Sequence, residues 1–228
     1  MLILALETAT PVGSVALVSE ERSVAGSYFD IGLQHSQRLF VEIEGILGAA
    51  DCAVSDLSAV AVSIGPGSFT GLRIGLSAAK GLCLAGNTSL VTVSTLEALA
   101  ARIPYARHPV CPVLDARREE VYTALYDTAS GRPQPLVRPR AVAPDLLARE
   151  RAGETTIYLG DGAVRYRDLL GPPPHALYPP VHCARPEAGT VGWLALGRLQ
   201  AGQIADLEAA EPEYFRQPDL GVRAQPGR

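Results

Sequence analysis

The chain has 228 residues, enough to bury a substantial core in one large domain or two small ones. Its net charge of −4 and its dispersed arginines argue against a protein that grips nucleic acid through a basic face of its own. The four cysteines form no CxxC pair, so we expect free thiols in a reducing cytosol and no zinc site. Glu7 interrupts the apolar N-terminus, which we interpret as a buried strand of a soluble, cytoplasmic protein without a membrane segment.

The first half predicts an alternation of strands and helices. Apolar residues recur at helical spacing after His35, and Ser94 followed by Glu97 has the spacing of a capping box. Short apolar runs between turn residues predict the strands. The expected strands cover residues 2–6, 14–18, 23–29, 59–64 and 90–93, and the expected helices cover 35–47, 69–84 and 95–102.

The second half repeats the beginning of the first. One offset of 108 residues matches Glu7 with Asp115, and it also matches the Ala-Leu pair at 16–17 with that at 124–125. We therefore predict a duplicated α/β unit with subdomains 1–106 and 107–228, the second smaller and more irregular. Its expected elements are a loop with one strand over 131–144, helical turns over 145–151 capped by Asp145, a strand over 156–159, helices over 163–170 and 191–199, and a frayed tail from about 217.

A glycine-rich segment, GPGSFTGLRIG at 65–75, follows a predicted strand and begins a predicted helix. The Walker pattern requires lysine and a hydroxyl residue after its last glycine, but Leu72 and Arg73 follow Gly71 here. The dinucleotide spacing fails as well, because Thr70 stands three residues after Gly67. We interpret the segment as a strand-to-helix turn with Ser68 as N-cap.

The helix after this turn is rich in small residues, including Gly71, Gly75 and Gly81. Each glycine inside a helix costs about 0.5–1 kcal/mol relative to alanine, so close packing must recover that stability. Packing on its own sheet accounts for part of this. Small residues on several sides also make the helix a candidate interface, and the stripe of Leu39, Phe40 and Ile43 is a second candidate.

Two acids stand where a duplicated nucleotide-binding fold places a metal or phosphate contact. Glu7 ends the first strand beside Thr8 and Thr10, and Asp115 has the equivalent position in the second half. Two carboxylates at one cleft could hold Mg²⁺ through water, or each could simply cap its own turn. The four histidines form no HxxxH pair, so we assign no catalytic residue and no metal ligand.

Six segments occur in an order that closely resembles the TsaB (YeaZ) family of tRNA threonylcarbamoyladenosine biosynthesis proteins. The resemblance implies an actin-like (ASKHA, ribonuclease H-like) α/β fold made of two duplicated subdomains. The segments are LALETATPVGSVAL at 4–17, HSQRL at 35–39, GPGSFTGLRIG at 65–75, VSTLEALA at 93–100, VLDARREEVY at 113–122 and PEYFR at 212–216.

The resemblance also implies a role. The catalytic paralogue TsaD carries two metal-binding histidines where this chain has Thr95 and Leu99, neither of them a useful ligand of a transition metal. Glu7 also replaces the aspartate that is more usual at the first phosphate loop. The chain is thus similar to a non-catalytic scaffold subunit that activates TsaD, which transfers threonylcarbamoyl to N6 of the adenosine 3′ of the anticodon in tRNAs reading codons that begin with A.

Several partners and one surface follow from the same resemblance. The implied partners are a TsaD-like paralogue, a TsaE-like ATPase, tRNA through the complex, and a second copy when the chain is alone. No cofactor is implied beyond weak ATP or ADP with Mg²⁺ in the assembly, with contacts at Glu7, Thr8, Thr10 and Asp115. The alternative is an ATP- and Mg²⁺-dependent phospho- or acyltransferase that uses Glu7 and Asp115. The expected interface residues are His35, Leu39, Phe40, Ile43, Leu72, Arg73, Gly75, Leu76 and Ala79.

Overall fold

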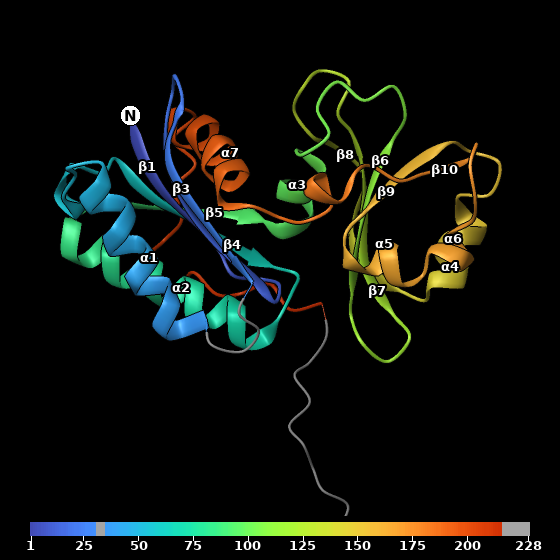
Figure 1. Cartoon of the computed structure of the whole chain (residues 1–228), viewed down its shortest axis with the longest axis horizontal. Coiled ribbons are helices and arrows are strands. Elements are labelled where there is room, and N and C mark those ends of the chain that lie inside the picture. Colours follow the sequence, from blue (N-terminus) through green and yellow to red (C-terminus); the bar gives the residue numbers. More distant parts are fainter. Residues whose placement is uncertain (31–34, 216–228) are drawn as a thin grey trace, which may run out of the picture.

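The computed structural model describes residues 1–30 and 35–215, so the expected frayed tail lies outside the described residues. Two five-stranded sheets stand side by side, with a short helix between them (Figure 1). The first half contains β1 (Leu2–Glu7), β2 (Val12–Ser19), β3 (Ser23–Asp30), α1 (His35–Ala49), β4 (Ala59–Gly65), α2 (Phe69–Gly86), β5 (Ser89–Ser94) and α3 (Thr95–Ala100). The second contains β6 (Val110–Asp115), β7 (Val121–Asp127), β8 (Gln134–Val142), α4 (Pro144–Glu150), β9 (Thr156–Leu159), α5 (Asp161–Arg165), α6 (Arg167–Leu170), β10 (Ala176–Leu177) and α7 (Ala188–Gln200).

Both sheets have the same topology, which confirms the predicted duplication. The first sheet runs β3-β2-β1-β4-β5, and the second runs β8-β7-β6-β9-β10 when read in the same sense. In each sheet, the first three strands of the half pair antiparallel with one another. The fourth strand pairs parallel with the first, and the fifth pairs parallel with the fourth. This repeated order is the actin-like, ribonuclease H-like architecture that the resemblance implied.

The two hairpins differ in register by one residue, although the offset of 108 predicts the same register. Glu7 lies opposite Ser14, seven residues on, whereas Asp115 lies opposite Val121, six residues on. The second hairpin is tighter because residues 117–119 all have positive φ, at 63°, 50° and 59°. The two carboxylates still end equivalent strands, but the matched Ala-Leu pairs are not equivalent, since Thr123 takes the place of Ala16.

Each sheet buries both faces under helices. On the first sheet, α1 and α2 cover the face that presents Leu4, Leu6 and Val62. The face that presents Ile3, Ala5 and Ala61 packs against α7. The apolar runs of β1 and β4 are therefore continuous, because neither side of these strands meets water.

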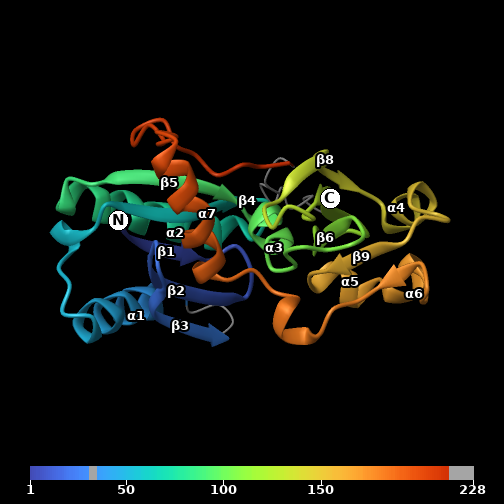
Figure 2. The same cartoon turned by 90° about the horizontal axis from the view of Figure 1, so that it is seen from above.

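The chain returns to the first sheet after completing the second, as the view in Figure 2 shows for α7. The backbone N–H of Ala188, at the start of α7, donates to the Ser14 hydroxyl at 2.9 Å. The backbone N–H of Ala205 bonds to Leu90, and that of Glu213 bonds to Ile64. The boundary predicted at 106/107 does separate the two sheets. The span 107–228, however, is not one spatial unit, because residues 188–213 pack on the first half.

Helix boundaries differ from expectation at three points. Ser94 precedes α3, but its hydroxyl makes no capping bond, and Glu97 pairs with Arg198 instead of reaching back. Ala143, not Asp145, is the N-cap of α4. The helix expected over 163–170 is two short helices, α5 and α6, separated by Tyr166.

Two further expectations concern cysteines and membranes. The four cysteines are all free thiols, as predicted. In the described ranges 1–30 and 35–215, none of the helices combines the length and apolar character that crossing a bilayer requires.

Candidate functional site

The glycine turn places the N-terminus of α2 against the β1–β2 turn. Ser68 caps the helix, as predicted, because its hydroxyl accepts the backbone N–H of Gly71 at 3.3 Å. A Cβ added to Gly71 would lie 2.0 Å from the backbone oxygen of Thr8, and one added to Gly67 would lie 2.4 Å from that of Ala9. At Gly75 a Cβ would lie 2.2 Å from the Thr8 hydroxyl. These three glycines therefore serve internal packing and hold two backbones in close contact.

The β1–β2 turn uses its polar groups within the chain. The Thr8 hydroxyl donates to the Gly71 carbonyl at 2.8 Å, and the Thr10 hydroxyl donates to the Val12 carbonyl at 3.1 Å. The Ala9 carbonyl accepts the backbone N–H of Ser68 at 2.6 Å. Thr8 and Thr10 are also buried. The hydroxyls that a phosphate contact requires are thus engaged in holding α2 and the turn.

Glu7 is fully buried beneath this turn. Its Oε1 accepts the backbone N–H of Ala9 at 2.6 Å, while Oε2 is buried without a hydrogen-bond partner in the described structure. Burial raises the pKa of Glu7 from its ordinary 4.5 to about 7, although the neighbouring Ser63 hydroxyl and the Ala9 N–H favour the charged form. The Ser63 hydroxyl is itself buried without a well-formed hydrogen bond. Glu7 is therefore a carboxyl group shut off from solvent, with a pKa close to neutral pH.

Asp115, the equivalent acid, is paired with cations of its own half. Its Oδ2 lies 2.9 Å from Nη1 of Arg165 and 3.7 Å from Nη1 of Arg117. Nearby Asp161 accepts the backbone N–H of Asp115 at 3.1 Å, and burial raises the pKa of Asp161. Across residues 1–30 and 35–215, no group of three or more His, Cys, Asp or Glu side chains is placed to hold a metal ion. Asp115 is thus engaged with arginines of its own half, whereas Glu7 is buried beneath the β1–β2 turn.

Most of the expected interface residues face the core of this chain. Among those with described side chains, only Phe40 and Arg73 are exposed. His35 begins α1, but its side chain lies outside the described part of the structure. Of the expected interface residues with described side chains, a partner could therefore touch only Phe40 and Arg73 directly; its other contacts with these helices would be at other positions. The six buried residues are Leu39, Ile43, Leu72, Gly75, Leu76 and Ala79.

The outer surface of α1 and α2 combines Phe40 and Gly81, which the sequence had pointed to, with Gly45, Gly48 and Leu84, which it had not. A Cβ added to Gly45 or Gly48 of α1, or to Gly81 of α2, would meet nothing within 4 Å. Exposed apolar side chains accompany them, with Phe40 at 49% exposure and Leu84 at 73%. We call this surface the α1–α2 face. Helix periodicity could have found it, because Gly45, Gly48, Gly81 and Leu84 lie opposite the buried stripe of each helix.

Arg73 is held by Tyr214 of the C-terminal segment, where no helix or strand was predicted. Its guanidinium lies 3.8 Å from the centre of the Phe69 ring, and its Nε donates to the Tyr214 hydroxyl at 3.0 Å. The ring of Phe215 in turn lies 6.4 Å from that of Tyr122 in the second half. Residues 213–215 thus connect the two halves. The adjacent aromatic residues Tyr214 and Phe215, in a polar C-terminal segment, were the sequence signal for this contact.

Comparison with known proteins decides the family. The sequence model described as "TsaD: tRNA N6-adenosine threonylcarbamoyltransferase" matches residues 31–149. The chain is 30% identical over 234 residues, covering 100% of both chains, to the tRNA threonylcarbamoyladenosine biosynthesis protein TsaB of Escherichia coli. The chain belongs to the TsaB family.

Two further relatives agree with this membership. The TsaB protein of Bacillus subtilis is 37% identical over 131 residues, a match that spans 58% of this chain and 57% of that protein. The solved structure of YeaZ from Pseudomonas aeruginosa has a TM-score of 0.82 at 31% identity, covering 93% of this chain and 99% of that one. The TsaB fold is thus shared over nearly the whole chain.

Helix α3 carries the two positions where the family resemblance implied a difference from the catalytic paralogue. Thr95 and Leu99, which the resemblance compared with the paralogue's histidines, are both fully buried. Leu99 packs with Leu96 and Leu114 at the junction of the two halves. The Thr95 hydroxyl is buried with no hydrogen-bond partner in the described structure. This position is therefore part of the packed junction, and its residues offer no imidazole to a metal.

Proposed function

We propose that the chain is a non-catalytic subunit of the machinery that transfers threonylcarbamoyl to N6 of adenosine in tRNA. In this proposal it docks a TsaD-like paralogue through the α1–α2 face and activates it. Family membership supports the pathway, and the absence of histidine at positions 95 and 99 supports a non-catalytic role. The engaged turn at Thr8 to Thr10 further supports a chain that requires no nucleotide of its own.

The three solvent-facing glycines carry the docking part of the proposal. Together they cost the free chain roughly 2 kcal/mol relative to alanine, and within residues 1–30 and 35–215 no neighbouring atom lies within 4 Å of a Cβ placed at any of them. Gly71 and Gly75 differ, because the Thr8 backbone and side chain occupy the space beside them. A partner helix could approach α1 and α2 closely at these glycines, because they have no side chain to keep the backbones apart. Exposed Phe40, Val41 and Leu84 supply apolar area for it.

The remaining partners follow from the same assembly. A TsaE-like ATPase would join the complex, and ATP or ADP with Mg²⁺ would bind weakly in the assembly. The paralogue would make most of the contacts with tRNA. A net charge of −4 suits a subunit with little RNA contact of its own. A free chain would cover the α1–α2 face with a second copy. The proposal places the chain in the cytoplasm, where tRNA is modified.

Reconstitution tests the role directly. We expect the TsaD-like paralogue of the same organism, with a TsaE-like ATPase, threonylcarbamoyl-adenylate and tRNA, to give modified tRNA only when this chain is added. Full activity of the paralogue without the chain would contradict the scaffold role. Tight ATP binding with turnover by the isolated chain, measured by calorimetry and phosphate release, would instead support the transferase alternative.

Substitution of Gly81 separates docking from folding. We expect Gly81→Ala to stabilise the free chain by about 0.5–1 kcal/mol in urea denaturation, because alanine favours the helix and meets no neighbour. Gly81→Gln should fold equally well but weaken binding to the TsaD-like paralogue about tenfold or more, since its side chain occupies the partner's space. The calorimetric affinity for the paralogue measures this loss.

Ala201→Gln is the matched control for this experiment. Ala201 is exposed at the end of α7, which covers the other face of the first sheet. We expect the Ala201→Gln variant to bind the paralogue with the same affinity as the unmodified chain. If Gly81→Gln also binds with unchanged affinity, the α1–α2 face is not the docking surface.

A further inference from the structure

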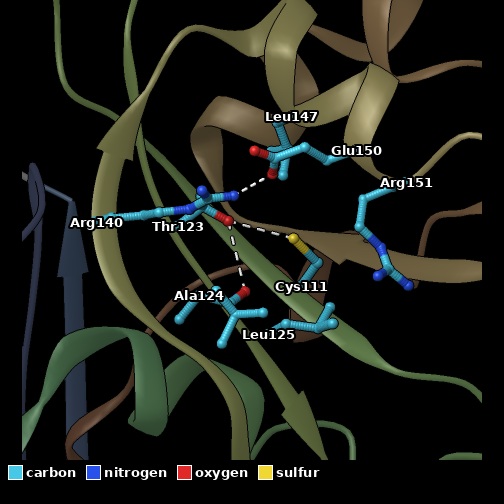
Figure 3. A pocket seen from close by; sticks show the side chains of 9 residues that line it. Cys111, Thr123, Ala124, Leu125, Arg140, Leu147, Glu150 and Arg151 are labelled. Carbon is cyan, nitrogen blue, oxygen red and sulfur yellow. Dashed lines mark hydrogen bonds and ion pairs between the residues drawn. The ribbon is translucent and has the colours of Figure 1, made fainter.

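A cavity of about 150 Å³ lies in the second half between the sheet and α4 (Figure 3). Its apolar lining includes Leu125 of β7, Val137 of β8 and Leu147 of α4. Its polar lining includes Thr123 and Arg140. Val137 and Arg140 are partly exposed, so a small solute can enter beside β8.

The cavity exists because the duplicated halves differ in one helix. In both halves a helix follows the third strand and covers the same face of its sheet. In the first half this helix is α1, with 15 residues, and Leu39, Ile43 and Ile46 fill the core. In the second it is α4, with seven residues, whose buried side chains are Pro144 and Leu147. A shorter helix leaves part of the sheet face without apolar neighbours.

One buried hydrogen-bond donor in this lining has no partner. Figure 3 shows the Arg140 side chain reaching across the lining toward Thr123 and Glu150. Its Nη2 pairs with the Glu150 carboxylate, but its Nε is buried without a hydrogen-bond partner in the described structure. The Thr123 hydroxyl is already used, because it donates to the Pro112 carbonyl at 2.8 Å. An unpaired buried N–H normally requires an acceptor.

The charges around the cavity are balanced before any ligand enters. Arg140 pairs with Glu150, and Arg151, the other arginine of the lining, lies 2.5 Å from Glu154. A buried anion would therefore compete with carboxylates that are already in place, and desolvating a charge is costly. A neutral carbonyl oxygen satisfies the N–H of Arg140 without that cost.

We propose that this cavity is a binding site for a small uncharged carbonyl compound with an apolar body. A protein cavity of this volume accommodates a molecule of about six non-hydrogen atoms, the size of benzene. The apolar part would lie against Leu125 and Leu147, and the carbonyl oxygen would accept the Nε–H of Arg140. This site is independent of the α1–α2 face and of the subunit's part in tRNA modification.

Isobutyramide and isobutyrate test the proposal as a matched pair, because both have six non-hydrogen atoms and only the second is charged. We expect isobutyramide to bind with a Kd of about 1 mM or weaker, as suits so small a ligand. It should shift the Arg140 Nε–H signal in ¹H–¹⁵N spectra of the full chain and raise the melting temperature by a few degrees at about ten times its Kd. Isobutyrate should bind at least tenfold more weakly.

Two variants locate the binding. Arg140→Met removes the donor, and Leu147→Phe fills part of the cavity, so each should abolish the melting-temperature shift caused by isobutyramide. Arg138→Met, on the same strand but outside this lining, should keep the full response. No response of the unmodified chain to either probe at 50-fold the expected Kd would overturn the site. Equal or tighter binding of isobutyrate would overturn the uncharged ligand class, and an undiminished response in both variants would place the binding elsewhere.

Discussion

Gly71→Ala is expected to destabilise the chain by about 3 kcal/mol, even though alanine is the better helix former. The added Cβ would lie 2.0 Å from the backbone oxygen of Thr8. Neither backbone can retreat easily, because the Thr8 hydroxyl bonds to the Gly71 carbonyl and the Ser68 N–H bonds to the Ala9 carbonyl. The free energy of unfolding in urea measures the loss.

Gly81→Ala is the internal control for this result, since it makes the same substitution in the same helix. The Cβ added at Gly81 meets nothing within 4 Å. The substitution should therefore raise the free energy of unfolding by about 0.5–1 kcal/mol, whereas Gly71→Ala lowers it. Similar effects of the two substitutions would show that α2 does not approach the β1–β2 turn as closely as described.

The stability of the chain is expected to fall as pH rises from about 4.5 to about 7, by about 3 kcal/mol from Glu7 alone. Below this window the carboxyl group is neutral in both the folded and the unfolded state. Within it the unfolded chain loses the proton while the buried side chain keeps it, which favours unfolding. Above about 7 both states are ionised and the contribution becomes constant.

Glu7→Gln isolates this contribution from that of the other acids. Glutamine is uncharged at every pH, and its side-chain oxygen can still accept the Ala9 N–H. The difference in unfolding free energy between Glu7→Gln and the unmodified chain should therefore grow between pH 4.5 and 7 and then level off. A difference that does not vary across that range would mean that Glu7 is solvated or charged in the folded state.

Much of the fold was predictable from local patterns. The strand expected over 156–159 is β9, and the helix expected after His35 is α1. These elements are set by apolar spacing within a dozen residues, which the sequence displays directly. The repeat of an acid after an apolar strand also predicted the duplication. The register of the second hairpin was not predictable, because three non-glycine residues with positive φ leave no compositional mark.

The candidate site was less predictable than the fold. Small residues in α2 predicted close approach, but sequence does not say whether the neighbour belongs to the same chain. Gly71 and Gly75 meet Thr8, whereas Gly81 faces open space. Leu72 and Leu76 were likewise predicted to be interface residues, but they belong to the core. The sequence does not distinguish the two roles, because both require apolar side chains.

The sequence by itself determined the family and the duplicated α/β architecture. Identity and short-range spacing are sufficient for these, since they are properties of residues and their near neighbours. Only the tertiary structure decided that Glu7 is sealed, that α7 returns to the first sheet and that a cavity lies under α4. Burial and cavities depend on contacts between residues far apart in the chain, and these are fixed only when the sheets and helices pack.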